Sequence, residues 1–168
     1  MPAAHARGRS GRRAARRAGE SGTRTEYLAF VLGGETYAVP IAQLAEILKP
    51  PPITDVPRAP SPVLGVISVR GKLVTVIDLR RRLRLAEAPT DRRTRILLVE
   101  SGGGEQMGLL VDEVHQVWRL AHEEIEAPGV LGGEQAVHIA GIGRPAGVDG
   151  AVLILLDLRP IVEGTRDG

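Results

Sequence analysis

Residues 63–80 read VLGVISVRGKLVTVIDLR, and this stretch decides the fold class. Two apolar runs, 63–69 and 72–77, flank the dipeptide Arg70-Gly71. A tight connection between two strands needs positive φ at its centre, which glycine adopts without steric cost. The stretch therefore predicts an antiparallel β-hairpin with Arg70 at its tip.

The same pattern occurs three more times along the chain. Each time, two short apolar runs flank a glycine-containing turn: 26–32 and 35–40, 95–100 and 106–111, and 137–143 and 151–156. Strands at this density predict an all-β protein built as small antiparallel barrels or a sandwich. Val, Ile and Leu must build the core, because the chain has only four aromatic residues.

An internal repeat sharpens this architecture. Residues 71–80 (GKLVTVIDLR) align without a gap to residues 150–159 (GAVLILLDLR), and Gly65 and Gly141 precede the two copies. The repeat indicates two related β-subdomains in one chain. Helix is expected to be scarce, because seven prolines lie between Pro40 and Pro62. Residues 41–45 predict one short helical turn, and residues 78–83 predict a short helix with Asp78 as N-cap.

Charge divides the chain into a tail and a body. The 168 residues carry a formal net charge of +2, but residues 1–24 hold seven arginines and one acid, a net of +6. The rest is mildly acidic, at −4. We expect residues 1–24 to be a disordered Arg-rich tail, 25–163 a folded domain and 164–168 a C-terminal tail. An arm that binds nucleic acid or an acidic membrane is the alternative interpretation of the Arg-rich segment.

Composition argues against several classes of protein. The absence of cysteine excludes disulfides and thiolate zinc sites and suits a cytoplasmic protein. The longest apolar run, 151–156, is far shorter than the ~18 residues of a spanning helix, so no direct membrane insertion is expected. Four aromatics are too few for a base-stacking platform, which argues against nucleic acid as a partner.

No constellation of catalytic residues is recognisable. The four histidines are not at metal-ligand spacing, and the glycine-rich stretch 141–147 lacks a phosphate-loop ending. No serine lies in a nucleophile-elbow motif. We therefore expect a binding module rather than an enzyme, with no catalytic residues, no metal and no cofactor.

Two charged residues in apolar surroundings are candidates for recognition. Arg70, at the hairpin tip, is either an interface anchor or a turn residue that favours solubility. Glu46 lies within an apolar stretch, as a recognition group or on the wet side of an edge strand. A regularly alternating strand would place Leu44 and Glu46 on one face, with Ala45 and Ile47 on the other.

Taken together, these residues resemble the CheW family of chemotaxis coupling proteins over about residues 25–163. The resemblance is carried by many spaced elements: residues 30–33, 37–41, 46–47, 56–60, 65–66, 70–71, 76–80, 94–100, 108–112, 117–120 and 152–158. It implies two SH3-like, five-stranded β-barrels packed on a shared hydrophobic core. It also implies a non-enzymatic adaptor that couples chemoreceptors to the histidine kinase CheA.

The resemblance further implies partners and site residues. The partners would be the cytoplasmic helical hairpin tip of a chemoreceptor and the regulatory domain of CheA, with recruitment to membrane-associated arrays. The receptor-facing residues would be Leu44, Glu46, Ile47, Gly65, Ser68, Arg70 and Val117. Apolar Leu44 and Ile47 would hold the receptor helices, and Arg70 would bind a carboxylate or carbonyl. No kinase-binding residue can be assigned, beyond an expectation of exposed strand ends and loops.

Two positions depart from the family pattern. Ser68 stands where the family usually has Asn, and Thr75 where it commonly has Pro.

Three functions are open on the sequence alone. They are the chemotaxis adaptor, an equivalent adaptor of a twitching-motility or other chemosensory pathway, and a nucleic-acid-binding β-barrel with a basic tail.

Overall fold

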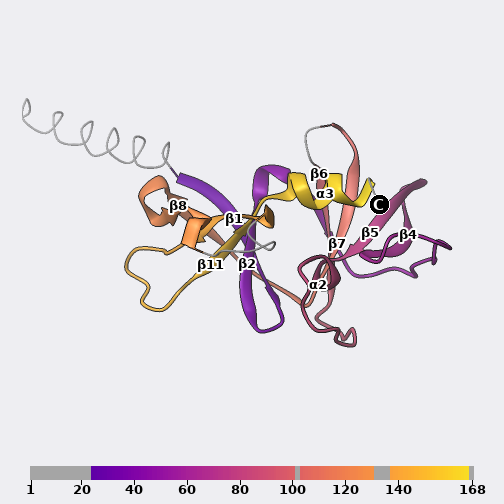
Figure 1. Ribbon diagram of the computed structural model, residues 1–168, viewed down its shortest axis with the longest axis horizontal. Helices are drawn as coiled ribbons and strands as arrows, with labels where there is room; N and C mark the ends of the chain where they lie inside the picture. The colour runs from indigo at the N-terminus through magenta and orange to yellow at the C-terminus, as the bar shows by residue number, and fades with distance from the viewer. Residues whose placement is uncertain (1–23, 101–102, 131–136, 167–168) are drawn as a thin grey trace, which may run out of the picture.

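The computed structural model describes residues 24–100, 103–130 and 137–166, which form two β-sheets that lie side by side (Figure 1). The first sheet has the strand order β8-β1-β2-β11-β10-β9. Its strands are β1 (Arg24–Leu32), β2 (Glu35–Pro40), β8 (Glu113–Ala121), β9 (Ile125–Glu126), β10 (Ile139–Gly143) and β11 (Leu153–Leu156). We call it sheet A.

The second sheet, sheet B, has the order β3-β6-β7-β5-β4. Its strands are β3 (Leu44–Leu48), β4 (Val63–Val69), β5 (Lys72–Asp78), β6 (Arg95–Glu100) and β7 (Gln106–Val111). The four predicted hairpins are all present, as the antiparallel pairs β1–β2, β4–β5, β6–β7 and β10–β11. In the β4–β5 turn Arg70 and Gly71 both have positive φ, of 49° and 81°.

Three hydrophobic clusters form the core. One cluster lies within sheet A (Ala29, Ala38, Leu120, Leu153 and Leu155) and one within sheet B (Ile67, Val74, Val76, Ile96 and Leu98). The third and largest takes side chains from both sheets, including Phe30 and Val39 of sheet A and Leu97 and Leu109 of sheet B. Two subdomains therefore share a common core, as the resemblance to the CheW family implies.

The internal repeat is also visible in the pairing of the strands. β5 pairs in parallel with β7, and its counterpart β11 pairs in parallel with β2. The strands around these pairs follow the same order in the two sheets. Sheet A has the order β8-β1-β2-β11-β10, and the corresponding strands of sheet B are β3-β6-β7-β5-β4. The subdomains are nevertheless not the two halves of the chain, since β1 and β2 lie in the sheet of the C-terminal strands.

The helices are short, and two of them were predicted from the sequence. A 3₁₀ turn, η1 (Ile41–Gln43), and the helix α2 (Leu79–Arg82) confirm the two helical predictions, and the Asp78 side chain accepts a hydrogen bond from the Arg80 backbone N–H. Two further 3₁₀ turns are η2 (His122–Glu124) and η3 (Pro128–Val130). The helix α3 (Leu158–Arg166) begins in the same way, because Asp157 accepts from the Arg159 N–H.

The ends of the fold differ from the expected boundaries. Arg24 already belongs to β1, and α3 includes residues 164–166, which the sequence assigned to a tail. The helix extends because Leu158, Ile161 and Val162 recur at helical spacing and pack into the shared core. The expected disorder of residues 1–23 and the segment 167–168 lie outside the described residues.

Candidate functional site

Glu46 and Arg70 meet at the edge of sheet B. The Arg70 Nη2 lies 2.7 Å from the Glu46 Oε2, and the side chains are 75% and 33% exposed, respectively. Glu46 is on β3 and Arg70 follows β4, the two outermost strands of the sheet. The ion pair therefore links the two edge strands of sheet B at this end.

The backbone of the hairpin fixes the position of Arg70. A positive φ is uncommon for a residue with a side chain, and here it is set by the two-residue turn between Val69 and Lys72. The guanidinium is thus held at the tip of a hairpin, where most of its surface faces solvent. It has N–H groups beyond the one that faces Glu46, and these can bind a carboxylate or carbonyl of a partner.

The expectation that Leu44 and Glu46 lie on the same face of their strand is wrong. A β-bulge shifts the register of β3 between these residues, so Leu44 pairs with Val99 and Glu46 pairs with Leu98. Leu44 consequently packs against the shared core, whereas Glu46 lies on the face of Leu48, which packs in sheet B. The regular alternation assumed from sequence fails because the bulge adds one residue to β3.

Ile47 and Val117 occupy equivalent places in the two subdomains. Ile47 pairs with Leu97, and Val117 of β8 pairs with Leu28. Both leucines belong to the shared core, and both strands carry a register shift just before the exposed residue. Ile47 is 41% exposed and Val117 46% exposed. Each of the two edge strands therefore has one exposed apolar side chain on the same face of its sheet as the shared core.

Two expected site residues remain, Gly65 and Ser68. Gly65 has a structural role, whereas Ser68 is exposed. Gly65 is buried, and a Cβ at this position would lie 2.1 Å from the backbone oxygen of Thr54. Its role is to let the segment at Thr54 pair with β4, so it cannot itself contact a partner through a side chain. Ser68 is exposed on β4, two residues before Arg70 and opposite Leu73.

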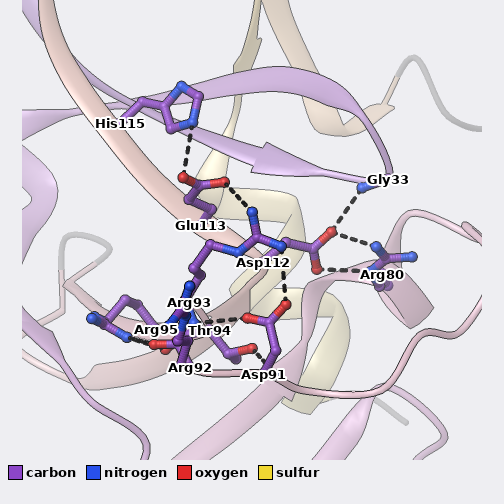
Figure 2. Close-up of polar contacts among 10 residues, drawn as sticks. All are labelled: Gly33, Arg80, Asp91, Arg92, Arg93, Thr94, Arg95, Asp112, Glu113 and His115. Carbon is purple, nitrogen blue, oxygen red and sulfur yellow. Dashed lines mark hydrogen bonds and ion pairs between the residues drawn. The ribbon is translucent and has the colours of Figure 1, made fainter.

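A polar network that joins the two sheets was missed by the sequence argument (Figure 2). The Asp112 carboxylate accepts hydrogen bonds from the Arg80 Nε, at 2.8 Å, from the Arg80 Nη2 and from the Gly33 N–H, at 3.0 Å. Arg80 belongs to α2 beside sheet B, and Gly33 lies in the β1–β2 turn of sheet A. No local signal could reveal this contact, because its members are 32 and 79 residues apart.

The network sets the ionisation of its two charged members. The hydrogen bond to Asp112 raises the pKa of Arg80. Burial raises the pKa of Asp112, but the hydrogen bonds from Arg80 and Gly33 and the Arg80 charge outweigh burial and leave that pKa below its ordinary value. Arg93 extends the network on the solvent side, 3.4 Å from Asp91 and 3.8 Å from Glu113.

Within the described residues there is no cluster of three or more metal-ligating side chains. The same part of the chain holds no helix that is long and apolar enough to cross a membrane.

A model of the CheW-like domain family matches residues 26–166. The chain belongs to the CheW-like family. Its agreement with a solved structure extends to the fold: the scaffolding protein TtCheW from Thermoanaerobacter tengcongensis is 30% identical, with a TM-score of 0.76 over 83% of this chain and 93% of that one. The expected fold class, two SH3-like subdomains on a shared core, is thereby confirmed.

Relatives of this CheW-like chain come from several bacteria. The chemotaxis protein CheW of Helicobacter pylori is 33% identical over 60% of this chain and 61% of its own length. The protein FrzA of Myxococcus xanthus is 32% identical over 77% of this chain and 81% of its own. The protein PilI of Pseudomonas aeruginosa is 34% identical over 52% and 48%. The family is one of bacterial adaptors and scaffolds, in keeping with the expectation of a binding module.

Proposed function

We propose that this CheW-like protein couples the cytoplasmic hairpin tip of a chemoreceptor to the regulatory domain of the histidine kinase CheA. The observations that carry the proposal are the ion pair between Glu46 and Arg70 and the exposed Ile47, which follows Glu46 on the edge strand β3. It combines an oriented guanidinium with an accessible apolar side chain, which is the composition of an interface anchor. The family membership of the chain supports the adaptor role.

The receptor site comprises Leu44, Glu46, Ile47, Gly65, Ser68, Arg70 and Val117, and their roles differ. Ile47 and Val117 supply apolar contact to the receptor helices, in the manner of a helix laid in a groove. Leu44 supports them from the shared core. Arg70 binds a receptor carboxylate or carbonyl, while Glu46 holds the guanidinium in place. Gly65 acts through the backbone, and Ser68 offers a hydroxyl at the exposed rim.

The remaining parts of the proposal concern the assembly. The protein acts without catalysis of its own and reaches the membrane-associated array through its receptor contact. Kinase contacts fall on exposed strand ends and loops of both subdomains, leaving the receptor site open to form a ternary complex.

A second pathway assignment has specific support. FrzA and PilI are similar to this chain, so an equivalent adaptor in a twitching-motility or other chemosensory pathway is the alternative. The fold and the receptor site would be the same in both cases. The genes adjacent to the coding gene, and the receptor and kinase types that they encode, distinguish the two assignments.

The test uses a receptor signalling fragment, CheA and the full chain. We expect the full chain to co-sediment with both and to change receptor-dependent autophosphorylation of the kinase. Arg70→Ala should weaken receptor binding, whereas Arg58→Ala, which removes another exposed arginine with positive φ, should not. Equal binding and equal kinase activity for Arg70→Ala and the wild type would show that the proposed site is wrong.

A further inference from the structure

Sheet A has a pocket of about 400 Å³ at the end of its barrel. The wall is made by the β1–β2 turn, by the start of β8 and by the residues that lead into β11. The residues that line it are Ala29, Gly34, Glu35, Thr36, His115, Gln116, Trp118, Gly150, Ala151, Val152 and Leu153. Its floor reaches the sheet A core through Ala29, which is fully buried. The pocket lies outside the proposed receptor residues.

The repeat relates this pocket to the Glu46–Arg70 corner of sheet B. Gln116 precedes Val117 as Glu46 precedes Ile47, on strands with the same bulge. Asp149 precedes Gly150 as Arg70 precedes Gly71, and the two glycines have φ values of 80° and 81°. In sheet B the corner is closed by a guanidinium that reaches a carboxylate.

Among the described residues, no arginine lines this corner of sheet A. At the equivalent positions stand Gln116, an amide, and Asp149, a carboxylate, which cannot form an ion pair with each other. The lining residues include the Glu35 carboxylate and the Trp118 indole but neither lysine nor arginine. A carboxylate beside an aromatic ring attracts a guanidinium, both by charge and through the face of the ring.

We propose that this pocket binds an arginine side chain of the chain's own N-terminal segment, residues 7–17. The bound guanidinium takes the place that Arg70 fills in sheet B, with Glu35 as the carboxylate and Trp118 as the apolar wall. The complementary charges are the net +6 of residues 1–24 and the net −4 of the rest of the chain.

The covalent connection puts several arginines within reach. Ala29 lies five residues along β1 from Arg24, a distance of about 17 Å at the rise of a strand. Arg17 precedes Arg24 by seven residues, which span up to about 25 Å when extended. Arg17, Arg16 and Arg13 can therefore enter the pocket. Tethering raises the effective concentration of these side chains to the millimolar range, so a weak contact suffices.

Trp118 is the only tryptophan in the chain, so its fluorescence reports on this pocket alone. The test compares acrylamide quenching of the full chain with that of a full-length variant in which Arg12, Arg13, Arg16 and Arg17 are replaced by Gln. At low salt we expect quenching to rise about twofold in the variant, because the indole is uncovered. Salt at 0.5 M should raise quenching of the wild type toward the same value, since exposed charges are then screened.

A peptide of residues 8–19 added to this variant should restore the protection of Trp118. Glu35→Gln in the variant should weaken peptide binding two- to fivefold, the range for an exposed ion pair. Asp55→Asn removes an equal charge from an exposed loop next to sheet B and should leave the affinity unchanged. Equal quenching of the wild type and the four-arginine variant would overturn the proposal. Peptide binding that is indifferent to Glu35→Gln would also overturn it.

Discussion

Arg80 and Asp112 form a charged clamp between the two subdomains. The Arg80 guanidinium binds the Asp112 carboxylate through two N–H groups, and its Nη1 donates to the backbone oxygen of Ala86, at 2.7 Å. Asp112 in turn follows β7 of sheet B and accepts from Gly33 of sheet A. The clamp thus fixes the segment through which the chain passes from one sheet to the other.

Loss of this clamp should destabilise the fold. Arg80→Ala leaves a carboxylate that is only 31% exposed without its main donors. We expect the free energy of unfolding to fall by about 2–3 kcal/mol, the scale for hydrogen bonds to charged groups. Arg144→Ala, which removes an ion pair with Glu126 in which both side chains are exposed, should cost below about 1 kcal/mol. Urea unfolding of both variants measures the difference, and equal losses would contradict a special role for Arg80.

The clamp also predicts a dependence of stability on acid pH. The pKa of Asp112 is lower in the folded protein than its ordinary value of 3.8, so below that value the unfolded chain binds the proton first. The stabilisation is therefore complete above about pH 4 and is lost as the pH falls through the folded pKa. Asp112→Asn should unfold more easily than the wild type at pH 6, and this difference should shrink between pH 4 and pH 2.

The hairpins were predictable because their signals are local. Gly33-Gly34 and Arg70-Gly71 have the positive φ values that two-residue turns require, and the strands on either side follow from them. The equivalence of β5 and β11 was visible as well, in the ten-residue repeat. Asp78 capped its helix as expected, since an N-cap contact reaches only two residues along the chain.

The features that were not predictable depend on distant partners. The bulge that separates Leu44 from Glu46 exists only in the pairing of β3 with β6. Whether β1 joins the first or the last strands of the chain is likewise a matter of long-range packing. The sequence therefore predicts the receptor site as a set of residues. It does not predict which of these residues face the shared core, which of them pair with each other, and which act through the backbone.

His138 should make stability fall in mildly acidic solution. Burial lowers its pKa below 6.5, and the Arg82 and Arg84 charges lower it further against the opposing effect of Asp157. The unfolded chain therefore takes up the proton first. Stability is complete above about pH 6.5 and falls as the pH drops from there toward the folded pKa. His138→Gln should make the melting temperature less dependent on pH between pH 7.5 and pH 5.5. An unchanged pH dependence in this variant would exclude His138 as the cause of the fall in stability.

Gly65→Ala should be far more disruptive than Gly71→Ala. The added methyl group at Gly65, where φ is 154°, would lie 2.1 Å from the Thr54 oxygen, so the backbone must move. At Gly71 nothing lies within 4 Å, and only the cost of positive φ remains, about 1 kcal/mol. We expect a loss of more than 3 kcal/mol at Gly65, with weaker receptor binding as a consequence of misfolding. Circular dichroism melts of the two variants test this order.

Ile47 and Val117 should affect binding rather than folding. Both side chains are more than 40% exposed, so Ile47→Ser and Val117→Ser remove little buried surface from the free protein. If a receptor helix covers them, each substitution forfeits apolar contact worth about 1–1.5 kcal/mol, which is roughly a tenfold loss of affinity. Val148→Ser is the matched control, because Val148 is 45% exposed and lies between β10 and β11, outside the proposed site. Titration of a receptor signalling fragment against the three variants, at equal melting temperatures, measures the effect. Should Val148→Ser weaken binding as much as the other two, the loss would not be specific to the edge strands β3 and β8, and the proposed contact surface would be wrong.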